Sequence, residues 1–178
     1  MRKLRTIEMK RLSVDEFRQA RKLPLTVVLD DVRSMHNVGS VLRTADAFLV
    51  EEVVLCGITG TPPHPEIHKT ALGAEDSVSW RYMPSAMDAV AELRSRGYTV
   101  LSIEQAEGST MLHEFFAEPD RHYAVVLGNE VKGVHQEVID LSDGCLEIPQ
   151  LGTKHSMNVS VTAGIVIYQF AEQLILLS

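Results

Sequence analysis

The sequence predicts an α/β fold in which a mostly parallel sheet carries helices on both faces. Three observations predict it. Apolar segments of strand length alternate with helical patterns, as in successive βαβ units. These segments are apolar along their whole length, which is typical of strands buried on both sides. The length of 178 residues and the hydrophobic content of 45% suit one domain with a full core.

Six segments are predicted to be strands, five from their apolar composition and 78–83 from its alternation of apolar and polar residues. They are residues 25–32, 51–57, 78–83, 98–104, 123–130 and 145–149. Helical patterns fall between them. The predicted helices cover 37–48, 85–97 with Ser85 as N-cap and Gly97 past its end, 135–141, and a final apolar helix beginning within 152–160. The Pro/Gly-rich stretch 59–77 predicts a long loop that holds one short helix.

The helix over 37–48 carries an arginine beside small residues. Val38, Val41 and Leu42 fall at the spacing of a buried face, whereas Arg43 points elsewhere. Its neighbours one turn away include Gly39, Ser40 and Ala47. This pattern suggests that the small residues leave room for a ligand to approach the guanidinium.

Charge is distributed unevenly along the chain. The formal net charge is −7, but residues 1–22 hold eight Lys/Arg and three Asp/Glu, hence +5, which leaves −12 for the remainder. We expect residues 1–22 to form a basic helical extension, which is either an arm for phosphate groups or a solvated helix.

Neither end of the chain predicts a membrane protein. The first twelve residues lack the apolar region of a signal peptide. The last twenty are apolar but interrupted by Gln169, Glu172 and Gln173, which favours a helix buried in a core or a subunit contact. A cytoplasmic location follows. Cys56 and Cys145 are expected to be buried reduced thiols.

Ligands of such sheets bind beyond the carboxyl ends of the strands, which directs attention to residues 102–110, 128–134 and 149–158. A P-loop is excluded, because the Lys and Ser/Thr that should follow "GNEVKG" are absent. No GxGxxG or GxSxG occurs. "HPEIH" (64–68) has a metal-like spacing, but Pro65 disfavours a helix at the preceding residue, so solvated histidines and no metal are expected.

The polar residues that remain each have a plain structural alternative. They are Asn37, Arg43, Glu130, Ser156 and Asn158. Asn37, Ser156 or Asn158 could cap a helix, Arg43 could pair with Asp46, and Glu130 could be a surface acid. Taken together they favour a functional site.

Three stretches carry a resemblance to a known family. They are "LDDVRSMHNVGSVLRTADAF", "YAVVLGNEVKGV" and "LEIPQLGTKHSMNVSVTAGIVIYQF". Their order and spacing resemble the three motifs of the SpoU (TrmH-like) branch of the SPOUT RNA methyltransferases, over residues 25–176. The resemblance implies a C-terminal trefoil knot, S-adenosylmethionine as cofactor, a homodimer with the active site at the subunit interface, and methylation of a ribose 2′-hydroxyl of tRNA or rRNA.

The resemblance also implies roles for individual residues. Arg43 would be central to catalysis, with Asn37, Glu130, Ser156 and Asn158 around it. The implied cofactor-binding residues are Ile103, Leu127, Gly128, Ile148, Met157 and Asn158. The methyltransferase domain would span 23–178. Two alternatives stay open: a catalytically inactive RNA-binding protein on the same fold, and a different small-molecule enzyme.

Arginine is a poor base at neutral pH, because its pKa lies above 12. We therefore expect Arg43 to hold a phosphate and to stabilise negative charge developing on the 2′-oxygen.

Overall fold

The computed structural model describes residues 1–177 and confirms the parallel α/β fold. Its seven-stranded sheet has the order β3-β2-β1-β6-β4-β7-β5, and every pairing is parallel. The strands are β1 (Leu23–Asp30), β2 (Val50–Cys56), β3 (Trp80–Met83), β4 (Thr99–Ile103), β5 (Thr110–Met111), β6 (Tyr123–Leu127) and β7 (Gly144–Glu147).

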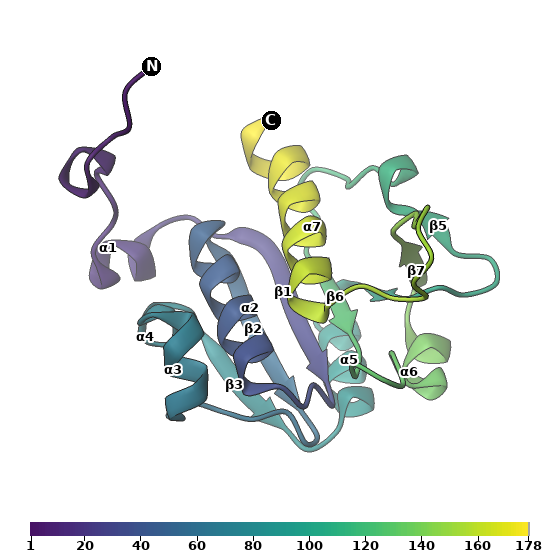
Figure 1. Ribbon diagram of the computed structural model, residues 1–178. Coiled ribbons are helices and arrows are strands. Elements are labelled where there is room, and N and C mark those ends of the chain that lie inside the picture. Colours follow the sequence, from purple (N-terminus) through teal and green to yellow (C-terminus); the bar gives the residue numbers. More distant parts are fainter. Residues whose placement is uncertain (178) are drawn as a thin grey trace.

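Helices cover both faces of this sheet (Figure 1). One layer holds α2 (Met35–Ala47), α3 (Pro65–Ala71), α4 (Ala74–Ser77) and α7 (Val159–Ala171), and the other holds α5 (Ala86–Ser95) and α6 (Gln136–Leu141). Successive residues of β1 serve opposite layers, since Val27 and Leu29 pack beneath the first and Val28 beneath the second. The strand is apolar along its whole length because helices cover both of its faces, as expected.

The main differences from the sequence prediction are three. Helix α2 begins at Met35, because the hydroxyl of Ser34 accepts from the Asn37 backbone N–H at 3.4 Å and caps the helix. The loop 59–77 holds two short helices instead of one. The first starts at Pro65 behind His64, whose Nδ1 accepts from the Glu66 N–H. Strand β5 was not predicted, because two residues carry no periodic pattern.

The apolar C-terminal segment packs one face against the core. Val159–Leu176 is long and apolar enough to cross a membrane, with a mean hydropathy of 1.5, and 39% of it is buried within the fold. Its residues Val166, Ile167 and Phe170 pack in the hydrophobic core between the sheet and the helix layer that contains α7. Gln173, one of the polar interruptions, bonds to the backbone of Phe115 and Ala117. The chain leaves α-helical geometry over Glu172–Leu176, which form a π-helical turn.

The N-terminal segment is only partly detached from the domain. It contains a 3₁₀ turn at Thr6–Met9 and helix α1 (Val14–Gln19), and Figure 1 shows it extending away from the sheet. Phe17 is buried in the core, and Arg18 donates to the carbonyl of Asp76 at 2.8 Å. Helix α1 is therefore anchored, whereas residues 1–5 and 7–13 before it are exposed.

Both cysteines are free thiols. Cys56 is buried as expected, and burial raises its pKa to about 12. Cys145 is half-buried, which corrects the expectation for that residue.

Candidate functional site

A cavity of about 830 Å³ opens at the carboxyl ends of β4, β6 and β7. All three segments that the sequence indicated contribute residues to its wall. Apolar side chains and backbone form one part of the wall: Ile103, Leu127, Gly128, Ile148, Met157 and Val159. This volume lies in the range of sites for small organic ligands.

Gly128 is required by the close approach of two backbone segments. A Cβ at this position would lie 2.1 Å from the carbonyl carbon of Gly133 and from the Val134 nitrogen. Gly133 itself has a φ of +70°, and a Cβ there would lie 2.1 Å from Oε2 of Glu104. That carboxylate accepts from the Val134 N–H at 3.1 Å. The 128–134 loop is therefore folded tightly against the end of β4.

Gly128→Ala should strongly weaken ligand binding in this cavity. The added methyl group cannot fit without separating Gly128 from the Gly133–Val134 backbone, which displaces the wall. We expect at least a tenfold loss of affinity for S-adenosylmethionine, the cofactor that the family resemblance implies, measured by isothermal titration. Gly152→Ala is the matched control, since a Cβ there meets nothing within 4 Å. Unchanged affinity in Gly128→Ala would contradict this view of the loop.

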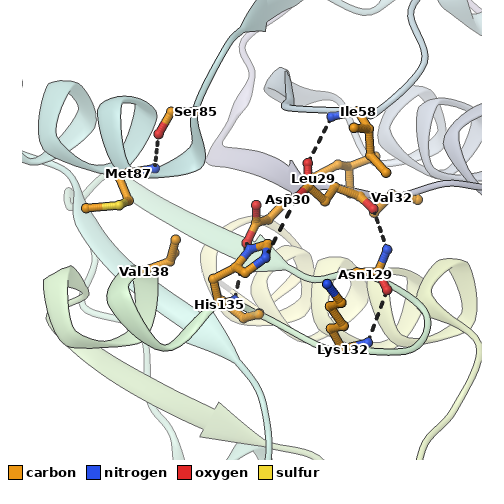
Figure 2. Close-up of polar contacts among 12 residues, drawn as sticks. Leu29, Asp30, Val32, Ile58, Ser85, Met87, Asn129, Lys132, His135 and Val138 are labelled. Carbon is orange, nitrogen blue, oxygen red and sulfur yellow. Dashed lines mark hydrogen bonds and ion pairs between the residues drawn. The ribbon is translucent and has the colours of Figure 1, made fainter.

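Residues at the end of β1 hold the 128–134 loop near its start, at Asn129, and just after its end, at His135 (Figure 2). The side-chain amide of Asn129 donates to the Asp31 carbonyl at 2.8 Å, and Asp30 Oδ2 lies 2.9 Å from Nδ1 of His135. The hydrogen bond to Asp30 raises the pKa of His135. Asp30, Asp31 and His135 could each offer a metal ligand, since one such atom from each lies within 4.8 Å of the others. Their existing bonds already account for the cluster as a loop anchor.

A chain of hydrogen bonds joins three of the predicted polar residues. Glu130 Oε1 accepts from the Asn37 side-chain amide at 3.0 Å. Asn37 Oδ1 in turn accepts from the Asn158 amide at 3.1 Å. Asn158 also caps α7, since its Oδ1 accepts from the Ser160 N–H. The first turns of α2 and α7 are thereby fixed to the cavity loop that carries Glu130.

Glu130 is held ionised by its donors. Burial tends to raise the pKa of its carboxyl, but hydrogen bonds from the Arg33 and Ser34 backbone and from Asn37 outweigh burial and lower that pKa. Both oxygens of Glu130 accept, so neither is left without a donor.

Glu130→Gln should destabilise the protein in a pH-dependent way. The amide NH₂ would oppose an N–H donor, at a cost of about 1–3 kcal/mol near pH 7. Because the folded pKa of Glu130 is lowered, its contribution is present above the unfolded pKa and is lost as pH falls through the folded value. The difference between wild type and variant in urea unfolding should therefore shrink below about pH 5. Exposed Glu114→Gln is the control, and a pH-independent difference would refute the assignment.

Arg43 lies apart from this network. It is exposed on α2, does not line the cavity and makes no hydrogen bond or ion pair within residues 1–177. The alternative pairing with Asp46 does not occur, since Asp46 accepts from the Ser77 hydroxyl. One interpretation of its neighbours was wrong: Gly39 is buried, and its missing Cβ makes room for the Ile67 carbonyl and Thr70 of α3 instead of for a ligand.

The other predicted residues divide between the cavity and its edge. Ser156 lines the cavity with all the predicted cofactor residues except Asn158, which bonds to Asn37 instead. The sequence reasoning missed Glu104, Gln105 and Thr162, which also line it. Gln105 donates to the carbonyl of His155 at 2.6 Å and joins two walls. The position of Glu104 at the carboxyl end of the predicted strand 98–104 was the available signal.

The chain is similar to known RNA-modifying enzymes. The family model described as SpoU rRNA Methylase matches residues 24–168. The tRNA (guanosine(18)-2′-O)-methyltransferase of Thermus thermophilus is 34% identical over 167 residues, which cover 93% of this chain and 84% of that protein. The enzyme of the same description in Escherichia coli is 32% identical over 158 residues, covering 86% and 66%.

Solved structures agree with these relatives. The A. aeolicus TrmH/SpoU tRNA modifying enzyme superposes with a TM-score of 0.79 and 25% identity, covering 90% of this chain and 81% of that one. An AdoMet-bound rRNA methyltransferase from Sinorhizobium meliloti gives a TM-score of 0.80 at 25% identity, covering 89% and 60%.

Proposed function

Because the chain belongs to the SpoU rRNA methylase family, we propose that it transfers a methyl group from S-adenosylmethionine to a ribose 2′-hydroxyl of tRNA or rRNA. The observation that carries this proposal is the cavity at the ends of β4, β6 and β7. The family motifs meet there, since Gly128, Glu130, Ser156 and Met157 line the cavity and Glu130 is bonded to Asn37.

The residues of the cavity fit the cofactor. Ile103, Leu127 and Ile148 offer apolar surface to an adenine ring, and Gly128 keeps the wall open to backbone contacts. The cofactor supplies, when bound, an activated methyl group on a sulfonium. The protein then has to align the acceptor oxygen with that group, which is largely a positioning task. The tightly braced 128–134 loop suits that task, since displacement of its backbone would move the wall.

Arg43 does not line the cavity of its own subunit. We propose a homodimer in which the α2 face of one subunit covers the cavity of its partner. An exposed apolar stripe on α7 supports this arrangement: Val161, Ile165 and Tyr168 are 53%, 40% and 47% exposed. Tyr168 also packs edge-on against Phe48 just after α2, so this stripe continues toward the helix that carries Arg43.

Transfer RNA is the substrate that the comparisons favour. The Thermus tRNA enzyme aligns over nearly all of this chain and most of its own length. We also propose that residues 1–22 act as an auxiliary RNA arm, and that the protein works in the cytoplasm, where these RNAs are processed. We also propose that the C-terminal part of the chain forms the trefoil knot that the family resemblance implies.

Removal of residues 1–12 should weaken RNA binding and reduce its salt dependence. These residues carry five Lys/Arg and one Glu, and the truncation spares Phe17, which is buried in the core. Each RNA phosphate that the truncated protein no longer neutralises should reduce the slope of log K against log salt by about 0.9 or less. Filter binding from low to high salt measures this slope, with wild type as reference. Identical slopes would show that residues 1–12 do not bind RNA.

Methyl transfer from labelled S-adenosylmethionine to total tRNA and, separately, to rRNA tests the proposed reaction. A 2′-O-methylnucleoside in one pool would confirm the reaction and identify the substrate class. Lack of transfer to both pools, with RNA still bound, would favour the catalytically inactive alternative. Thermal stabilisation by S-adenosylhomocysteine but not by ATP or NAD would separate the proposal from another small-molecule enzyme.

A further inference from the structure

The proposed reaction needs a group that takes the proton of the ribose 2′-hydroxyl, and neither Arg43 nor Glu130 supplies one. Arg43 is charged at neutral pH and has no proton-accepting atom. Glu130 already accepts at both oxygens, and its lowered pKa makes it a weak base. The identity of this acceptor is inferred on the basis of the proposed function.

His36 lies on the same exposed face of α2 as Arg43. The two are seven residues apart, which is two helical turns or about 10 Å along the axis, with Ser40 between them. Side chains on a helix lean toward its N-terminus, so the long Arg43 side chain extends in the direction of His36. An RNA strand whose phosphate is held by Arg43 would therefore pass close to the imidazole.

The backbone on either side of His36 is held in place by hydrogen bonds within its own subunit. The next residue in the chain is Asn37, whose amide donates to Glu130 at 3.0 Å. The hydroxyl of Thr70 donates to the His36 carbonyl at 2.9 Å and fixes the backbone to α3. The His36 side chain remains 55% exposed, so it is accessible to substrate.

Glu66 of α3 determines which nitrogen of the ring is free. Its carboxylate contacts Nε2 of His36 and also pairs with Lys69. The hydrogen bond from Lys69, followed by that from His36, lowers the pKa of Glu66 to about 2, so this carboxyl only accepts. Nε2 of the neutral ring must therefore carry the hydrogen, which leaves the lone pair on Nδ1 to act as acceptor.

We propose that His36 is the general base of the methyl transfer. Nδ1 takes the 2′-hydroxyl proton as the oxygen bonds to the methyl carbon and the carbon–sulfur bond breaks, leaving a neutral thioether. Glu66 stabilises the imidazolium that results, and the proton then passes to water. Arg43 contributes charge and positioning, while His36 contributes the acceptor, which resolves the chemical difficulty of using arginine for both tasks.

The first test is of geometry and does not depend on activity. Nitrogen NMR of the ¹⁵N-histidine-labelled full chain should show His36 protonated at Nε2 and free at Nδ1 in the neutral form. Glu66→Gln should mix the two tautomers, because the amide can also donate. A wild-type His36 with its hydrogen on Nδ1 would overturn the proposal.

The second test is of rate. His36→Gln should slow single-turnover methyl transfer by about 100-fold or more, with unchanged affinity for S-adenosylhomocysteine and RNA. Added imidazole should raise the methyl-transfer rate of His36→Ala at least tenfold, and it should not raise the rate of Arg43→Ala. The matched control is His113→Gln, since His113 is likewise exposed and lies near a carboxylate, Glu114.

The outcomes separate this inference from the proposed function. A wild-type protein that transfers no methyl group to RNA would refute the function itself. An active wild type with His36→Gln within threefold of it would overturn only the role of His36. A loss that imidazole does not restore would assign His36 to RNA binding or structure and would also overturn the proposal.

Discussion

Arg43→Ala is expected to lower the rate of methyl transfer by at least about 100-fold while leaving the affinity for S-adenosylhomocysteine unchanged. The two effects separate because Arg43 lies outside the cavity wall and makes no bond within residues 1–177. Its loss should not disturb the fold, so the whole effect should fall on the reaction. Single-turnover transfer to RNA gives the rate, and isothermal titration gives the affinity.

Arg43→Lys distinguishes geometry from charge. Lysine keeps the positive charge but lacks the planar, five-donor guanidinium that binds phosphate in a bidentate way. We expect at least a tenfold loss of rate in this variant. Exposed Arg121→Lys, far along the chain and paired with Glu118, should behave as wild type and serves as control. A rate for Arg43→Lys within twofold of wild type would reject the proposed role.

Local sequence patterns predicted most of the fold because its main determinants are local. Apolar runs marked five of the six longer strands, alternation marked β3, and Ser85 capped its helix as expected. Where the prediction failed, a single contact decided the outcome. The hydroxyl of Ser34 moved the start of α2, and two residues sufficed for β5 because they pair with β7.

The sequence indicated residues of the candidate site but not the contacts between them. Asn37 and Asn158 are 121 positions apart and meet only because α2 and α7 lie side by side, which no local pattern contains. Gly39 illustrates the reverse error. Its small size next to Arg43 suggested space for a ligand, yet the structure uses that space for α3. Small residues in a helix predict a close approach without saying what approaches.

The separation of Arg43 from the cavity makes the proposed dimer testable by complementation. One subunit would carry Arg43→Ala and the other Gly128→Ala, so each homodimer should be inactive for a different reason. In the heterodimer, the intact arginine of one subunit would face the intact cavity of the other, while the second site would carry both defects. One of two sites should work, giving about half of wild-type activity per dimer.

Coexpression with two affinity tags yields this heterodimer without refolding. The tandem-purified Arg43→Ala homodimer is the control, and Met157→Trp, which crowds the same cavity, replaces Gly128→Ala if that variant proves unstable. An inactive heterodimer would place Arg43 and the cavity of the same subunit in one site. Such a result would require α2 to move on binding RNA, because in this structure Arg43 is absent from its own cavity wall. Activity near half would instead explain why an exposed arginine on α2 accompanies an exposed apolar stripe on α7: both would be covered by the partner subunit.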